Sequence, residues 1–118
     1  MTDLTPDLQF LVGEPLNAVS FVMDYVEFHF NGSYLRCLAP PMVSRDGAVI
    51  AFPDAGSRDA FCRLIGAEVR AIRAADGGEL VVEFSDGAVV QMSMSHAERA
   101  SPEVLNFRNE GTGEVQFW

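Results

Sequence analysis

The sequence predicts an α+β fold that is mostly antiparallel β, with two repeated α-β-β-β units plus a C-terminal β-hairpin. Three observations predict it. An Asn-Gly pair at residues 31–32 separates two runs of β-forming residues, the preferred signal for a two-residue hairpin turn. A similar pair of runs surrounds Asp-Gly at residues 86–87, and a matching helical segment precedes each hairpin. The units cover about residues 5–43 and 57–94, and the tail covers 95–118.

The first hairpin, Tyr25–Leu38, has a register that keeps its two faces distinct. A two-residue loop predicts the pairs Phe30–Ser33, Phe28–Leu35, Val26–Cys37, His29–Tyr34, Glu27–Arg36 and Tyr25–Leu38. The first three pairs share an apolar face, and the opposite face sets Glu27 against Arg36, an opposite-charge pair. A slip of one residue would mix both faces, so this register is favoured.

The second hairpin, Leu80–Met94, needs a loop that is one residue longer. A two-residue loop at Asp86-Gly87 would place Glu83 opposite Val90 and mix the two faces. A three-residue loop with Gly87 in the left-handed conformation restores the pairs Phe84–Ala88, Val82–Val90 and Leu80–Met92.

A short helix and a glycine stop precede each hairpin. Leu8, Leu11, Val12 and Gly13 match Phe61, Leu64, Ile65 and Gly66, all at an offset of 53. We expect Val12 and Ile65 to be buried with the other apolar residues of their helices. Thr5-Pro6-Asp7 is typical of a helix start, and Ser57 or Asp54 is expected to cap the second helix.

The strand that follows each helix breaks the alternation expected of a half-buried strand. Leu16 and Val19 are three residues apart, and so are Val69 and Ile72, which predicts a bulge or a strand covered on both sides. Between the units, Asp46-Gly47 predicts a turn followed by a short extended segment. In the tail, Val104–Arg108 and Val115–Trp118 are expected as two short strands. Two units with a period near 54 residues favour a duplicated domain over a solenoid.

Composition limits the classes of partner and site. The 118 residues suit a single domain, 1–118, and an apolar fraction of 48% with nine Phe argues for a folded core. A net charge of −9 weighs against binding to nucleic acid or anionic membrane. No apolar run approaches the ~20 residues of a membrane span. With two cysteines and an N-terminal segment unlike a signal peptide, a cytoplasmic location with reduced thiols is expected.

The chain offers little catalytic chemistry. Cys37 is predicted on the core face and Cys62 beside a helix stripe, where cysteine acts as a small hydrophobe. His29 is predicted on the face opposite Cys37, which excludes a Cys-His dyad within the hairpin. The acidic residues Asp24, Glu27, Glu79 and Glu83 are expected to form solvated surface. No HExxH, CxxC pair, EF-hand, phosphate loop or GxSxG pattern occurs, so no catalytic residue, cofactor or metal site is predicted.

The outer face of the first hairpin is the predicted interaction surface. It carries Tyr25, His29, Tyr34 and Arg36, and Trp118 at the end of the tail is a further candidate. Aromatic and charged residues together are typical of recognition surfaces. A protein partner or a second copy of the chain could cover this face, and so could the second unit of the same chain.

Several short motifs carry a family resemblance. They are Leu11-Val12-Gly13, Phe30-Asn31-Gly32, Leu64-Ile65-Gly66, Phe84-Ser85-Asp86-Gly87 and Pro102-Glu103-Val104. With these motifs the chain resembles an uncharacterised bacterial family of small β-rich proteins, a domain of unknown function with an internally duplicated sheet unit. The resemblance implies a β-rich α+β fold and brings no established activity.

Three functional hypotheses follow. The first is a non-catalytic protein-binding or self-associating module. The second is a small-ligand binder or enzyme with a pocket between the two sheet units, using His29, Glu83 or Asp24. The third is an acidic toxin-neutralising protein, because the chain is similar in size and charge to immunity proteins of bacterial toxin systems.

Overall fold

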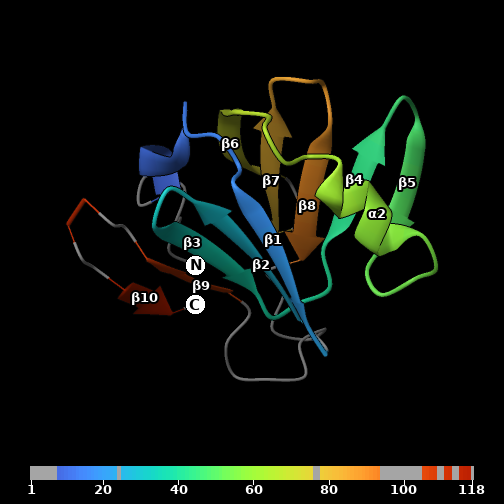
Figure 1. Cartoon of the computed structure of the whole chain (residues 1–118), viewed down its shortest axis with the longest axis horizontal. Helices are drawn as coiled ribbons and strands as arrows, with labels where there is room; N and C mark the ends of the chain where they lie inside the picture. Colours follow the sequence, from blue (N-terminus) through green and yellow to red (C-terminus); the bar gives the residue numbers. More distant parts are fainter. Residues whose placement is uncertain are drawn as a thin grey trace.

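The computed structural model describes residues 8–23, 25–75, 78–93, 105–108, 111–112 and 115–117. In these ranges the chain is mostly antiparallel β, with two five-stranded sheets and one short α-helix (Figure 1). Sheet 1 has the order β1-β2-β3-β9-β10, and sheet 2 has the order β5-β4-β8-β7-β6. The elements are the 3-10 helix η1 (Gln9–Leu11), β1 (Ala18–Val22), β2 (Tyr25–Phe30), β3 (Ser33–Cys37), β4 (Met42–Arg45), β5 (Ala48–Ala51), α2 (Ser57–Cys62), β6 (Val69–Ala75), β7 (Glu79–Phe84), β8 (Val89–Ser93), β9 (Leu105–Arg108) and β10 (Val115–Phe117).

Each sheet ends in a hairpin that comes from the other half of the sequence, β9–β10 in sheet 1 and β4–β5 in sheet 2. Strand β4 follows β3 in the sequence, yet it pairs with β8 of sheet 2. Strand β9 comes after β8, yet it pairs with β3 of sheet 1. The hairpin β9–β10 therefore holds in sheet 1 the place that β4–β5 holds in sheet 2. Each sheet is completed by a hairpin from the other half of the chain.

Local turn chemistry fixes the registers of both central hairpins as predicted. Strands β2 and β3 pair Phe28 with Leu35 and Glu27 with Arg36, and Asn31 and Gly32 have φ values of 50° and 93°. Strands β7 and β8 form the pairs Val82–Val90 and Leu80–Met92, and Phe84 donates its backbone N–H to the Ala88 carbonyl at 2.9 Å. Gly87 has a φ of 92°, as the three-residue loop requires.

The helical segments end before Val12 and Ile65, the residues that the sequence predicts to be buried with the other apolar residues of their helices. Leu8, Leu11, Phe61 and Leu64 are fully buried, but Val12 and Ile65 are 41% and 46% exposed, so their predicted burial is wrong. The reason is that η1 ends at Leu11 and α2 ends at Cys62, so helical periodicity no longer applies to Val12 and Ile65. The predicted side-chain cap of α2 is also wrong, because Gly56 holds the N-cap position and no side chain caps the helix. Neither helix in the described ranges has the length and apolar character needed to cross a membrane.

Reciprocal backbone hydrogen bonds join the segments that follow the two helices. The N–H of Gly13 donates to the Val69 carbonyl at 2.8 Å, and the N–H of Gly66 donates to the Leu16 carbonyl at 2.9 Å. In the same way Leu16 donates to Ala67 at 2.9 Å and Val69 donates to Glu14 at 3.0 Å. An isolated antiparallel bridge pairs Pro15 with Glu68. The predicted irregularity is present in β6, whose register shifts between Val69 and Ala71.

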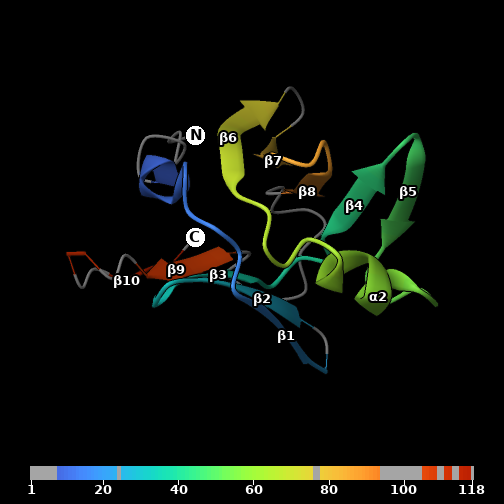
Figure 2. The same ribbon diagram turned by 45° about the horizontal axis from the view of Figure 1, so that its top comes forward.

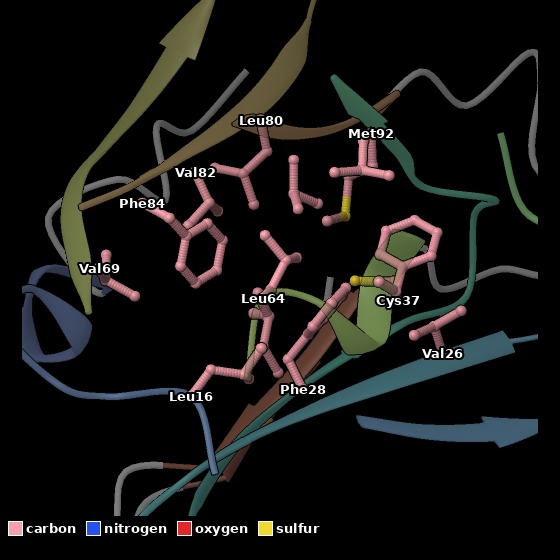
Figure 3. Close-up of a cluster of buried hydrophobic side chains, with 14 of the residues drawn as sticks. Leu16, Val26, Phe28, Cys37, Leu64, Val69, Leu80, Val82, Phe84 and Met92 are labelled. Carbon is pink, nitrogen blue, oxygen red and sulfur yellow. The ribbon is translucent and has the colours of Figure 1, made fainter. Parts of the chain in front are cut away.

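A single apolar core lies between the sheets. Figure 2 shows the sheets as two layers, and Figure 3 shows side chains from both layers meeting in the core. Phe28 of sheet 1 and Val82 of sheet 2 are both 2% exposed, and the rings of Phe28 and Phe61 have centroids 5.8 Å apart. A cavity of about 10 Å³ between the sheets is lined by Phe28, Phe30, Leu35, Val82, Phe84 and Val90. Side chains alternate along β2, β3, β7 and β8, so every second residue of these strands points away from this core.

Candidate functional site

The outer face of β2 and β3 brings together four of the five residues predicted for the interaction surface. Tyr25, Glu27 and His29 alternate with core residues on β2, and Tyr34 and Arg36 do the same on β3. We call these five residues the tyrosine–arginine face. All five are half-buried, and the side chains of His29 and Arg36 are 35% and 31% exposed. Trp118, the fifth predicted residue, lies outside the described residues.

Three described residues, Glu27, Tyr34 and Tyr25, hold the side chain of Arg36. Its Nε donates a hydrogen bond to Glu27 Oε2 at 2.6 Å. Its guanidinium carbon lies 5.1 Å from the ring centroid of Tyr34 and 5.8 Å from that of Tyr25. Partial burial alone would lower the pKa of Arg36, but the hydrogen bond and the charge of Glu27 outweigh it and raise the pKa above its usual value. The guanidinium is therefore a fixed, permanent charge in the middle of the face.

Glu27 also connects Arg36 to His29. Its Oε1 lies 3.3 Å from His29 Nε2, and Ser20 Oγ on β1 lies 3.3 Å from the same nitrogen. A Ser-His-acid triad needs the serine and the acid on opposite ring nitrogens, so that the acid orients the base. Here both contacts converge on Nε2. The arrangement fits a polar network that positions side chains, and it does not fit proton relay.

The remaining candidates do not converge on a reactive centre. Cys37 is fully buried on the opposite face of sheet 1, and burial raises the pKa of its thiol, which makes it unreactive. Cys62 is exposed on α2, so the prediction that it packs as a small hydrophobe is wrong. Over the described ranges, no three His, Cys, Asp or Glu side chains group in a way that could hold a metal ion.

The residues named for a pocket between the units lie apart. His29 is on the outer face of sheet 1, whereas Glu83 is on the outer face of sheet 2 with Arg73 Nε at 3.4 Å. Asp24 lies outside the described residues. The cavity between the sheets at Phe28 and Val82 is apolar and very small. Among the described residues, His29 and Glu83 are therefore not brought together in a polar site between the sheets.

Sequence reasoning missed a groove between α2 and the β4–β5 hairpin. Its volume is about 190 Å³, and its lining includes Arg45 and Arg63. The side chain of Arg45 also forms an ion pair with Asp86 at 2.8 Å, which ties the hairpin to the β7–β8 loop. The Asp46-Gly47 turn was a signal for the hairpin itself. Nothing local in the sequence indicates that α2 packs beside it.

Comparison of the chain with protein-family models, with curated proteins and with solved structures found no match. The chain nevertheless contains an internal comparison, because β7 and β8 take the places in sheet 2 that β2 and β3 take in sheet 1. The positions that correspond to the tyrosine–arginine face hold Glu79, Val81, Glu83, Val89 and Gln91. They include no aromatic ring and no cation. The face is thus a feature of sheet 1 and not a requirement of the strand order.

Proposed function

We propose that the chain is a non-catalytic protein-binding module that meets its partner through the tyrosine–arginine face. The observation that carries this proposal is the position of Arg36, which is fixed over two tyrosine rings, whereas the corresponding positions of β7 and β8 in sheet 2 hold neither residue type. Tyrosine and arginine are the residue types most enriched where interfaces gain most of their energy.

The geometry of the face favours binding. Sheet 2 packs against the inner side of sheet 1, so the tyrosine–arginine face lies on the side of sheet 1 that is turned away from sheet 2. The ion pair with Glu27 and the two rings already restrict the side chain of Arg36. A partner that contacts it therefore loses less side-chain entropy on binding than it would with a mobile arginine.

The charge of the chain narrows the class of partner. With a net charge of −9, two copies repel each other, whereas a basic protein is attracted and steered toward the surface. A basic protein partner is therefore favoured over self-association. The size and charge of the chain also resemble those of immunity proteins of bacterial toxin systems. This analogy supports a narrower proposal, a toxin-neutralising role.

A photo-crosslinking experiment in the native host tests the proposal. Val22 on β1 pairs with Tyr25 and is 38% exposed, so a benzophenone amino acid at position 22 samples the face without replacing its members. The matched control carries the same amino acid at Arg73, on the outer face of sheet 2, whose side chain is 56% exposed. We expect a discrete adduct from position 22, reduced about tenfold by Arg36→Ala, since loss of a central contact costs about 2 kcal/mol.

Three outcomes separate the alternatives. Equal adducts from positions 22 and 73, or an adduct that Arg36→Ala leaves unchanged, would contradict the proposed surface. An adduct with twice the mass of the chain would indicate self-association instead of a different partner. Sedimentation equilibrium of the purified chain provides an independent measure of that state.

We also infer that the two halves are copies of one ancestral unit. The four hydrogen bonds that join residues 13–16 to residues 66–69 are related pairwise by the offset of 53, and the sheets have matching strand orders. An inner face that is common to both halves and an outer face that differs support a scaffold that was duplicated and then specialised on one side. Substitutions that exchange core residues at matching positions, such as Val82→Phe combined with Phe28→Val, conserve total core volume and test whether the two positions are equivalent in packing.

A further inference from the structure

The groove beside α2 has an apolar wall built from three elements. Alternate residues of the β4–β5 hairpin, Val43 and Ile50, face the helix, and Ala60 of α2 completes the wall. Figure 2 shows α2 beside β4 and β5. At about 190 Å³ the groove is larger than the roughly 150 Å³ cavity that holds a benzene ring in another protein. It can hold a ligand the size of one substituted ring.

The charged residues that line the groove differ in whether they have an ion-pair partner. Arg45 is paired with Asp86 at 2.8 Å, and Asp46 lies at the hairpin turn. Arg63 has neither an ion-pair partner nor an aromatic ring beneath its guanidinium within the part of the chain that the structure describes. By contrast, Arg58 lies over Phe52 at 5.2 Å, and Arg73 pairs with Glu83. Arg63 therefore brings a cation without a direct ion-pair partner among the described residues to a groove that combines an apolar wall with Arg45 and Asp46.

We propose that this groove binds a small monocarboxylate with an apolar body, such as an aromatic or branched-chain acid. The carboxylate accepts hydrogen bonds from the planar guanidinium of Arg63. The apolar body lies against Val43, Ile50 and Ala60 and loses contact with water. Such a group can belong to a free acid or to the C-terminal residue of a peptide. This site is separate from the tyrosine–arginine face and does not depend on the function proposed for it.

The test is a titration of the isotope-labelled full chain followed by amide NMR shifts. Sodium benzoate is the probe for a free acid, N-acetyl-leucine represents a C-terminal residue, and benzamide is the neutral control of the same shape. We expect saturable shifts at Ala48, Ile50, Ala60 and Arg63, with a Kd on the order of 1 mM for so small a ligand. Benzamide is expected to bind about tenfold more weakly, because it lacks the charge-assisted hydrogen bonds.

Three variants make the result decisive. Arg63→Gln should weaken benzoate binding about tenfold, while Arg73→Gln, an exposed arginine on another surface, should leave it unchanged. Ala60→Leu should fill the groove and abolish binding without adding or removing charge. The proposal is overturned by shifts that do not saturate, by equal binding of benzoate and benzamide, or by full affinity in Arg63→Gln. Preference for N-acetyl-leucine over benzoate would assign the site to a peptide terminus.

Discussion

Leu16 and Val69 occupy reciprocal positions where the two halves of the chain meet. The Leu16 carbonyl accepts the N–H of Gly66 at 2.9 Å, and the Val69 carbonyl accepts the N–H of Gly13 at 2.8 Å. Both side chains are 1% exposed. Each half thus contributes one glycine and one buried apolar residue to the junction.

The two glycines should have the same energetic role. Gly13 and Gly66 have φ values of 90° and 98°, and a Cβ at either position meets no atom within 4 Å. Replacement by alanine should therefore cost about 1–2 kcal/mol of unfolding free energy from backbone strain alone, and the two variants should agree. Urea denaturation measures this cost. Asparagine tolerates the left-handed conformation better and should cost less, whereas a large cost at one glycine and none at the other would contradict the equivalence.

The centre of the core should be the most sensitive region. Phe28→Ala removes a ring that packs between the sheets and against Phe61, and should lower the free energy of unfolding by about 3–5 kcal/mol. Val49→Ala is the control, because Val49 is 60% exposed and should change stability by less than about 0.5 kcal/mol. Chemical denaturation compares the two. A mild effect of Phe28→Ala would contradict the packing of the sheets around one core.

Asp86 should give the stability a defined pH dependence. Its partial burial alone would raise the pKa of the carboxyl, but the Ala88 N–H at 3.0 Å and the Arg45 guanidinium at 2.8 Å outweigh it and hold the pKa below its usual value. The folded state therefore favours the ionised carboxylate. This stabilisation is complete above the unfolded pKa of about 3.9 and is lost as the pH falls through the lower folded value.

Two variants test that assignment. Asp86→Asn should lower the unfolding free energy by about 1 kcal/mol at neutral pH, and the difference from the wild type should shrink as the pH falls below about 4. Arg45→Gln should remove part of the same stabilisation, so the double variant should lose less than the sum of the two single losses. Urea titrations at several pH values measure both effects. A pH-independent difference for Asp86→Asn would refute the ionic origin.

The two thiols should differ strongly in reactivity. Cys62 is exposed, whereas Cys37 is fully buried and burial raises the pKa of its thiol. A disulfide reagent should therefore modify one thiol in the native chain and both in denaturant. Cys62→Ser should abolish the fast native reaction, and Cys37→Ser should leave it intact. Rapid native modification of both thiols would show that the core around Cys37 opens easily.

Local signals were sufficient to predict the hairpins. The Asn31-Gly32 turn determines the register of β2 and β3, because positive φ at both positions admits only this alignment of the apolar residues. Gly87 does the same for β7 and β8. These registers predict from the sequence alone that His29, Tyr34 and Arg36 lie on one face of the sheet.

Non-local pairing was not predictable in the same way. Nothing in the Met42–Arg45 segment indicates that it pairs with β8 and not with the adjacent β3, because a strand's partner depends on the whole assembled sheet. The helical period also predicted the burial of Val12 and Ile65 wrongly, since both residues lie just beyond very short helices. The groove at Arg63 depends on the packing of α2 beside the β4–β5 hairpin, which is also non-local, so the sequence alone could not reveal it.

The exchanged hairpins also bear on how the chain unfolds. If residues 105–117 detach, β3 is left as a bare edge with its backbone donors and acceptors unpaired, and detachment of β4 does the same to β8. Local unfolding in one half of the chain therefore destabilises the sheet of the other half. The molecule should unfold in a single cooperative transition. Limited proteolysis should therefore not leave either half of the chain as a folded fragment.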